Sequence, residues 1–392
     1  MKQRLLTLLA SATIILASLA TYSCNRVDPE PDPQPQPEEL PTYSIKSLDQ
    51  MTLREKVGQM FIIHPEKLVA SGAAQTQGSQ EMKETFEKYP AGGVTFFAQN
   101  IKSPEQTKAF TRFIHDLPNY PLICVDEEGG RVARIGKNDN FNVITYTSMN
   151  AVGATGNPEK AFEAGNNIGL YLKLYGFDID FAPVADVNTN PNNTVIGDRA
   201  FSDKPDVAAQ MVAKFLNGLQ KTSVEGCLKH FPGHGDTQTD SHYGYAETLK
   251  TWDEISACEM IPFRKGIEAG AKMIMTAHIS APKVTGTEDP STLSYKMVTE
   301  KLRNELGFKG IIITDGMGMA AITKQYTAAE AAELAIKAGI DIVLLPPDYI
   351  SAFDAIVEAV ETGRIPESRI NESVDRILKL KKAILTSRGQ LK

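Results

Sequence analysis

Apolar and polar positions follow two different patterns along most of the chain. Beyond residue 43, short apolar runs rich in Val, Ile and Phe recur, and segments with helical spacing separate them. The runs predict eight strands, at residues 57–64, 93–97, 121–127, 177–187, 226–231, 272–279, 310–315 and 341–345. Eight strands that alternate with helices predict an α/β fold, a single (β/α)8 barrel of the TIM type.

Helix boundaries are also readable between these runs. In three places a Thr is followed three residues later by Glu, which is the spacing of a capping box: Thr52, Thr251 and Thr327. Gly339 is placed to end a helix over 328–338, and Pro366 to open a last amphipathic helix that runs to about residue 382.

An open doubly wound sheet is the main alternative to the barrel. That fold needs fewer strands and carries a glycine-rich phosphate-binding fingerprint, G-x-G-x-x-G, after an early strand. The sequence shows no such fingerprint and no internal repeat. We therefore expect residues 44–392 to form one catalytic barrel without a second α/β sandwich domain.

The first residues have the pattern of a targeting segment. A short basic start precedes an apolar run from Leu5 to Ala20, and Cys24 follows soon after. We interpret residues 1–24 as a signal peptide, with Cys24 as a lipid acceptor and plain secretion as the alternative. Residues 25–43 are rich in Pro, Glu and Asp, which predicts an extended linker. The expectation is an exported lipoprotein, anchored to a membrane only through Cys24 and located in the periplasm or at the cell surface.

Composition narrows the function classes. The 392 residues carry a net charge of −7 and include no basic stripe, so we expect no nucleic-acid partner. Cys124 and Cys227 lie in apolar strand-like runs, and we expect buried thiols rather than a disulfide framework. No sequence feature calls for a cofactor.

Polar side chains end six of the eight predicted strands. They include His64, Asp126, Asp186, the pair Lys229 and His230, His278 and Asp315. In a barrel these ends meet at one mouth, where such folds carry their chemistry. A single polar strand end is more often a cap or an ion-pair partner. The set as a whole points to a site.

The densest group of candidate residues is the segment 229–242. It holds three of the six histidines, and its Gly, Pro, Thr and Ser residues indicate a loop that follows a strand. Asp240 lies two residues before His242, so its carboxylate could orient and stabilise a proton-transferring imidazole. The alternative is a hydrogen-bonded clasp within the loop.

Asp315 follows the apolar run 311–314 directly and would lie at the floor of the pocket. It could instead cap a helix, although Gly316 and Gly318 make a poor helix start. The cations Arg131, Arg134, Arg199 and Lys229 could contact a substrate or form structural ion pairs. The residues alone leave both readings open.

Four motifs, in this order, resemble those of family 3 glycoside hydrolases. They are Val-Asp-Glu-Glu-Gly-Gly-Arg-Val-Ala-Arg at 125–134, Gly-Asp-Arg-Ala-Phe at 197–201, Lys-His-Phe-Pro-Gly-His-Gly-Asp-Thr at 229–237 with Asp-Ser-His at 240–242, and Gly-Ile-Ile-Ile-Thr-Asp-Gly-Met at 310–317. The similarity covers about residues 47–380. It is specific to the single-barrel β-N-acetylglucosaminidases that use an Asp–His pair.

This resemblance implies roles for the matched residues. Asp315 matches the nucleophile, and His242 the acid/base, with Asp240 as its partner. The matched sugar-binding positions are Asp126, Arg134, Arg199, Lys229 and His230. The implied activity is retaining exo-hydrolysis of terminal N-acetylglucosamine from peptidoglycan- or chitin-type glycans, without a metal. Gly316 departs from the family pattern, which often has a second Asp there.

Three other functions are compatible with the same residues. A neutral imidazole repels an incoming anion less than a carboxylate does, so phosphate could replace water and make the protein a phosphorylase. His64, His230, His278 and Asp315 could surround a metal in a metal-dependent barrel hydrolase. The barrel could also be an inactive sugar-binding lipoprotein.

Overall fold

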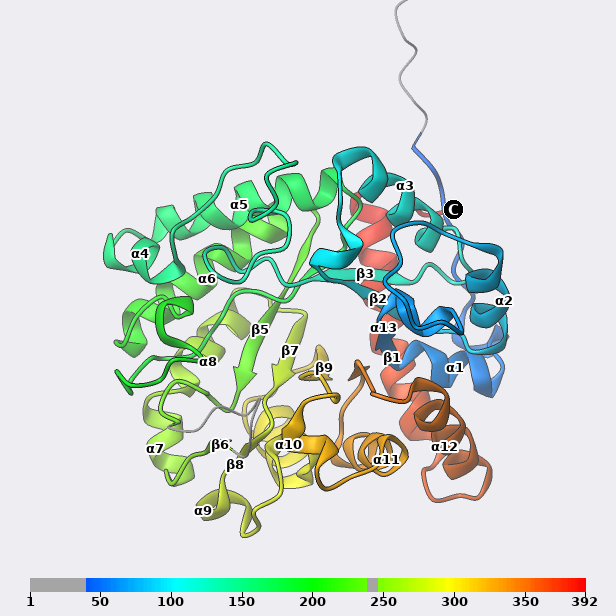
Figure 1. Ribbon diagram of the computed structural model, residues 1–392. Coiled ribbons are helices and arrows are strands. Elements are labelled where there is room, and N and C mark those ends of the chain that lie inside the picture. Colours follow the sequence, from blue (N-terminus) through cyan, green and yellow to red (C-terminus); the bar gives the residue numbers. More distant parts are fainter. Residues whose placement is uncertain (1–39, 238–245) are drawn as a thin grey trace, which may run out of the picture. The chain divides into compact units, whose positions relative to one another are not determined.

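The computed structural model describes residues 40–237 and 246–392 (Figure 1). In the unit from Pro41 to Lys392, eight parallel strands pair in the order β10-β1-β2-β3-β4-β5-β7-β9. They are β1 (Phe61–Ile63), β2 (Gly93–Phe96), β3 (Leu122–Val125), β4 (Ile179–Asp180), β5 (Glu225–Phe231), β7 (Met273–Thr276), β9 (Ile311–Thr314) and β10 (Val343–Leu344). All eight fall within or across the predicted runs.

Backbone contacts close this sheet into a ring. Ile313 of β9 forms a parallel bridge with Ile342, just before β10, and the amide of Thr314 donates to the carbonyl of Ile342 at 3.0 Å. The first and last strands of the order are thereby joined. The predicted (β/α)8 barrel is confirmed.

Helices surround the strands (Figure 1). They are α1 (Leu53–Gln59), α2 (Gln80–Lys88), α3 (Pro104–His115), α4 (Met149–Ala154), α5 (Pro158–Leu174), α6 (Pro205–Lys221), α7 (Trp252–Ala257), α8 (Met260–Glu268), α9 (Pro282–Thr285), α10 (Ala320–Thr323), α11 (Ala328–Ala338), α12 (Tyr349–Glu361) and α13 (Glu367–Ser387). Short 3₁₀ segments are η1 (Leu48–Gln50), η2 (Pro65–Leu68), η3 (Ala98–Asn100), η4 (Gly197–Arg199) and η5 (Ser291–Leu293), and η6 (Lys296–Glu305) is π-helical. None of the helices in the described ranges is long and apolar enough to cross a membrane.

The predicted helix ends form as the side chains dictate. Thr52, Thr251 and Thr327 each accept a hydrogen bond from the backbone N–H three residues later. The Glu at that position accepts one from the backbone N–H of the Thr. Gly339 ends α11 with φ 114°, a left-handed conformation that glycine adopts without steric cost. The last helix ends at Ser387, five residues beyond the predicted end at 382.

Three strand predictions were too long, and two of them lie in the first half of the chain. Residues 57–59 belong to α1, because the capping box at Thr52 starts a helix that runs into the apolar stretch, and β1 begins only at Phe61. In the run 177–187 the ladder stops after Asp180, and Pro183 has no N–H to continue it. An isolated bridge between Val184 and Lys229 resumes the pairing.

A second, two-stranded sheet lies outside the ring. It consists of β6 (Ala246–Glu247) and β8 (Ile279–Ser280), which pair in parallel. The predicted sixth strand, 272–279, therefore ends at Thr276, and Ile279 belongs to this separate sheet.

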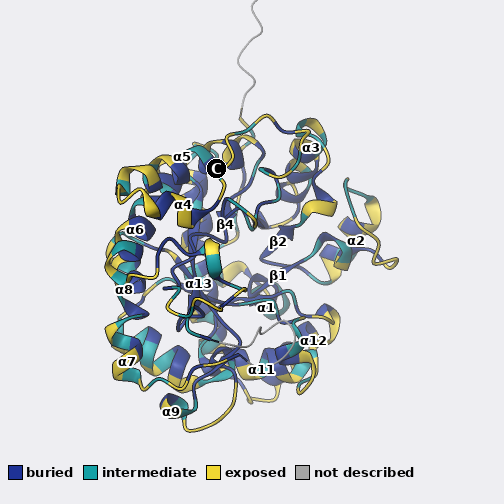
Figure 2. Ribbon diagram, turned by 60° about the vertical axis from the view of Figure 1, so that its left-hand side comes forward, coloured by how far each residue is buried: buried dark blue, intermediate teal, exposed yellow. Residues whose placement is uncertain are grey.

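The barrel strands are almost entirely buried, and most surrounding helices bury one side and expose the other (Figure 2). Cys124 and Cys227 are fully buried free thiols, as the apolar runs predicted. Strands buried on both faces show near-continuous apolar runs rather than alternation, which is why the sequence revealed them as blocks.

Candidate active site

The carboxyl ends of the barrel strands surround a pocket of about 290 Å³. Six predicted site residues lie within the described ranges, and all six line this pocket: Asp126, Arg134, Arg199, Lys229, His230 and Asp315. They come from separate strand ends and loops, so closure of the barrel is what brings them together. Phe97, Phe181, Met319 and Leu345 add an apolar wall.

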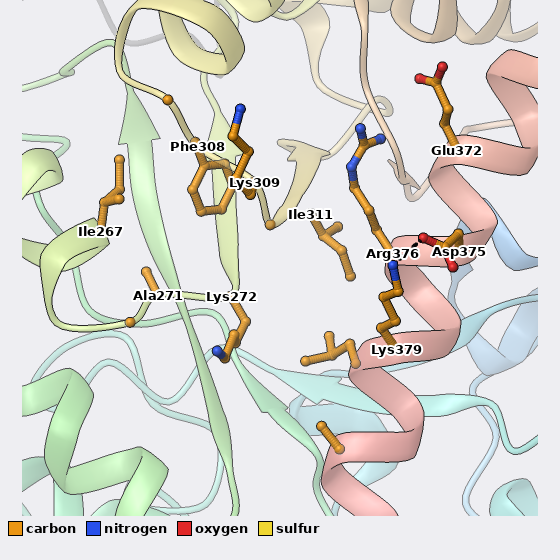
Figure 3. A pocket seen from close by; sticks show the side chains of 15 residues that line it. Ile267, Ala271, Lys272, Phe308, Lys309, Ile311, Glu372, Asp375, Arg376 and Lys379 are labelled. Atoms are coloured by element: carbon orange, nitrogen blue, oxygen red, sulfur yellow. Dashed lines mark hydrogen bonds and ion pairs between the residues drawn. The ribbon is translucent and has the colours of Figure 1, made fainter.

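A larger cavity, of about 700 Å³, lies at the opposite end of the barrel, between α13 and the starts of β7 and β9 (Figure 3). Its charged side chains include Lys272 and Lys309 at the strand starts and Asp375 and Lys379 on α13. Asp375 and Lys379 are paired with each other at 2.6 Å and are half-exposed or exposed. Size alone does not define a site. In TIM barrels chemistry occurs at the other face, where the smaller pocket lies.

A buried carboxylate organises the cations of the smaller pocket. Glu128 is 1% exposed, and it accepts hydrogen bonds from Nε and Nη2 of Arg199, both at 2.8 Å. The ammonium of Lys229 lies 2.6 Å from its Oε1. Burial alone would raise the pKa of Glu128, but the charges of Arg199 and Lys229 hold that pKa far below its usual range. Burial alone would lower the pKa values of both cations, but nearby carboxylates raise them, Glu128 for Arg199 and Asp126 together with Glu128 for Lys229.

Asp126 continues the charge network along the pocket wall. Lys229 donates to its Oδ1 at 2.9 Å, and Arg134 donates to its Oδ2 at 3.3 Å. The guanidinium of Arg134 also lies 5.0 Å from the ring centre of Phe97, a cation–π distance. Its Nε is buried and has no hydrogen-bond partner among the residues that the structure describes. A donor in this position is available to a ligand in the pocket.

The imidazole of His230 contacts the carboxylate of Asp186, which is fully buried. Oδ2 of Asp186 lies 2.7 Å from Nδ1 of His230, and its Oδ1 accepts from the amide of His234 at 2.6 Å. The other ring nitrogen, Nε2, lies 3.3 Å from Nη2 of Arg199. Asp186 therefore fixes the orientation of an imidazole whose Nε2 edge faces the pocket cations.

Asp315 follows the last residue of β9, and the amide of Gly316 donates to its Oδ1 at 2.7 Å. Burial by itself would raise the pKa of Asp315. The imidazoles of His230 and His278 and the Gly316 amide more than offset burial, so the pKa is lowered overall. The side chain is therefore an anion at neutral pH, in a pocket that supplies positive charge around it.

Sequence reasoning did not single out Glu127 or Glu128, and it placed Asp186 among the polar strand ends without giving it a role of its own. Glu127 is fully buried, and its carboxylate accepts from the amides of Arg134 and Gly136 at 2.6 and 2.7 Å. It thereby fixes the turn that carries Arg134 into the pocket. The signal was present, since three consecutive acids, Asp126, Glu127 and Glu128, directly follow the buried strand β3, where an unpaired charge would be costly.

Asp240 and His242 lie outside the described residues, so their predicted roles stay predictions. The backbone on either side is described. Thr237 before them bonds His234, its Oγ1 lying 2.8 Å from Nδ1, and Ala246 after them begins β6. Both flanks therefore attach to the mouth of the barrel.

The residues named for a metal site have other contacts. Both ring nitrogens of His278 are engaged, with Oγ1 of Thr292 at 3.0 Å and the carbonyl of Gly316 at 3.1 Å. The ring of His64 packs on Phe97, with ring centres 4.6 Å apart. Across residues 40–237 and 246–392 there is no group of three or more His, Cys, Asp or Glu side chains arranged to hold a metal ion.

Residues 52–380 match the glycosyl hydrolase family 3 N-terminal domain, and the chain belongs to this family. It is 35% identical over 300 residues to a β-hexosaminidase of Nitrosomonas eutropha, covering 74% of this chain and 85% of that protein. It is 34% identical over 349 residues to β-hexosaminidase A of Pseudoalteromonas piscicida, covering 81% of this chain and 58% of that protein.

A solved structure shares the fold. The family 3 β-N-acetylglucosaminidase of a Paenibacillus species superimposes with a TM-score of 0.80 at 34% identity, covering 86% of this chain and 63% of that one. The chain thus spans about three fifths of the length of the Pseudoalteromonas and Paenibacillus proteins.

Proposed function

We propose that the protein is a retaining exo-β-N-acetylglucosaminidase that removes terminal N-acetylglucosamine from peptidoglycan- or chitin-type glycans. The observation that carries the proposal is an ionised Asp315 inside a pocket whose rim is built from fixed cations. The volume of about 290 Å³ is at the lower end for small-molecule sites, about 300–1,000 Å³, as suits one sugar unit. The relatives named β-hexosaminidase support the same activity.

The proposed chemistry proceeds in two displacements. Asp315 attacks the anomeric carbon, the glycosidic bond breaks, and the leaving oxygen takes a proton from the His242 imidazolium. Water then gives a proton to His242 and displaces Asp315 from the sugar, which restores both groups. Asp240 stabilises the imidazolium that gives its proton in the first step and re-forms in the second.

The buried charges prepare the pocket for this chemistry. The transition state carries positive charge on the sugar ring, which the Asp315 carboxylate stabilises. Arg134, Arg199 and Lys229 present N–H donors to hydroxyl and carbonyl oxygens of the bound sugar. Because these donors are fixed before substrate arrives, they need little reorganisation when it binds.

An aryl N-acetylglucosaminide assay tests the activity. We expect turnover by the wild-type protein with retained anomeric configuration in the first-formed sugar, read by NMR. Asp315→Asn should lower kcat by about 10⁴-fold or more, because it removes the nucleophile. Asp375→Asn on α13 is the matched control and should be fully active. An unaffected Asp315→Asn variant would disprove the assignment.

A second comparison tests the proton donor. His242→Ala should lose most activity on a disaccharide and much less on an aryl substrate with a good leaving group, since that group needs little protonation. Equal losses on both substrates would contradict the role. Running both assays with and without phosphate separates hydrolysis, which releases free sugar, from phosphorolysis, which releases sugar 1-phosphate.

We further propose that the protein is exported and lipid-anchored through Cys24. The support is the sequence pattern of residues 1–24 and the Pro-rich acidic stretch that follows. Radiolabelled palmitate should be incorporated into the wild-type protein and should be absent from Cys24→Ala, which should also leave the membrane fraction. A Cys24→Ala protein that stays in the membrane fraction would refute the anchor.

A further inference from the structure

We propose that Glu128 is the positioning residue of the sugar site, because one buried carboxylate sets the places of both Arg199 and Lys229. The inference rests on the proposed function, since it assumes that these two cations contact the sugar. It assigns Glu128 no contact with the reacting atoms.

The inference rests on the geometry of the contacts that Arg199 and Lys229 make with Glu128. Arg199 meets Glu128 with two parallel N–H groups at 2.8 Å, the fork arrangement that fixes the guanidinium plane as well as its position. Lys229 reaches the same carboxylate from a different strand, β5, at 2.6 Å. The side chains of Glu128 and Lys229 are 1% and 3% exposed, so water does not replace these contacts.

Counting hydrogen bonds shows which N–H groups of Lys229 and Arg199 remain for a ligand. An ammonium has three N–H groups and a guanidinium has five. Lys229 uses two on Glu128 and Asp126. Arg199 uses four on Glu128, His230 and the carbonyl of Val195. Among the described residues, these contacts leave one N–H on each cation, and the contacts to Glu128 set its direction.

Charge gives Glu128 a second role. Lys229 and Arg199 lie side by side and repel each other, and both line the pocket that contains Asp315. A carboxylate between them cancels part of their joint field. Without it, the two cations would separate, and their field would act more strongly on Asp315.

The test compares Glu128→Gln with wild type on an aryl N-acetylglucosaminide. The amide of Gln keeps the size of the side chain, but its NH₂ group is a donor and would face an N–H of one of the cations. The side chain therefore cannot accept hydrogen bonds from both cations. Misplacing the two donors should lower kcat/KM by about 10²-fold. Because the donors bind the sugar ring before the reaction as well as during it, the loss should appear as a higher KM.

Two further readouts separate positioning from a general loss of structure. The dissociation constant of free N-acetylglucosamine, measured by calorimetry, should rise by the same factor as KM. The acid limb of kcat/KM should move to lower pH, because the unmasked cations favour ionised Asp315. Partial unfolding would instead reduce kcat and leave KM, the dissociation constant and the pH limb unchanged, and that result overturns the inference.

Controls come from the same chain. Glu225→Gln, at the start of β5 and bonded by Gln220, makes the same change far from the pocket and should behave as wild type. In an Arg199→Met background, Glu128→Gln should cost much less than in wild type, because the two residues act as a unit. Losses of kcat/KM that simply add in the double variant overturn the inference. A kcat/KM of the Glu128→Gln single variant within threefold of wild type overturns it as well.

If Glu128→Gln does not fold, Glu128→Asp decides the question. It keeps the charge and shortens the reach, so KM and the sugar dissociation constant should rise together, and unchanged values overturn the inference. If wild type does not turn over the aryl substrate, the proposed function fails by itself. The calorimetric comparison still tests whether Glu128 sets the sugar site.

Discussion

Lys381 of α13 offers a sharp test of how burial governs charge in this barrel. Its side chain is fully buried, and its amine donates to Oε1 of Gln59 at 2.6 Å and to the carbonyl of Asn119 at 3.1 Å. Burial lowers the pKa of Lys381 from 10.5 to about 7, although Asp178 nearby opposes the shift. The perturbation is Lys381→Met, which keeps the length of the side chain and removes the titrating group.

The pKa difference sets the direction and size of the effect. Between pH 7 and pH 10.5 the unfolded chain holds a proton on Lys381 that the folded protein releases, so stability rises with pH across this window. Below pH 7 both states are protonated and the full penalty remains. A gap of about 3.5 units, at about 1.4 kcal/mol per unit, gives a penalty of about 5 kcal/mol. About 3 kcal/mol of it is relieved between pH 7 and pH 10.

Urea unfolding followed by circular dichroism at several pH values between 7 and 10 measures this slope. Other groups titrate in the same range, so the quantity of interest is the wild-type change minus the Lys381→Met change. We expect a difference of about 3 kcal/mol, with wild type gaining more. The absolute stability of the variant is less informative, because two buried acceptors lose their donor at about 1–3 kcal/mol each.

Lys382→Met is the matched control, since Lys382 is the next residue on α13 and is exposed. It should follow the wild-type pH dependence. Parallel curves for wild type and Lys381→Met would mean that Lys381 keeps its proton in the folded state, and the reasoning from burial would be refuted.

Two further substitutions test the geometry of the pocket. Asp186→Asn should lower kcat/KM by about 10²-fold with little change in the melting temperature, because its NH₂ forces the ring proton of His230 onto Nε2, where it meets the donor of Arg199. An unchanged kcat/KM would show that Asp186 does not orient His230. Gly235→Ala should destabilise the protein by about 1–3 kcal/mol, because the added Cβ would lie 1.9 Å from the carbonyl oxygen of Val187, which is rigid backbone. Thermal unfolding measures this, and a melting temperature equal to wild type would contradict it.

The fold was predictable because its signals are local. Capping boxes, the Gly339 stop and apolar runs each act within a few residues, and together they predicted the eight strands of the barrel. The errors occurred where two local signals competed. Residues 57–59 are apolar enough for a strand, but the cap at Thr52 had already started a helix.

The site was predictable only in part, for a related reason. Strand-end position indicated Asp315, Lys229 and His230, because barrel topology alone brings strand ends together. Pairing of charges depends on contacts between residues far apart in sequence. The ion pair between Glu128 and Arg199 joins residues 71 positions apart, and no local sequence pattern indicates it. Glu128 was therefore missed although its neighbours Arg199 and Lys229 were found.

Buried ionic clusters occur at both ends of the barrel, and hydrogen-bond saturation distinguishes their roles. At the amino-terminal end, Arg388 donates to Asp178 at 2.7 Å and to the carbonyls of Phe177 and Ser223 at 2.7 and 2.9 Å, which ties α13 to the strands. In the pocket at the other end, within residues 40–237 and 246–392, Arg134 makes one side-chain hydrogen bond, at 3.3 Å, and its buried Nε has no partner. An unmet buried donor is costly in the free protein. A ligand oxygen in the pocket would recover that cost, so the incomplete pairing of Arg134 is itself an argument that this end of the barrel binds a polar molecule.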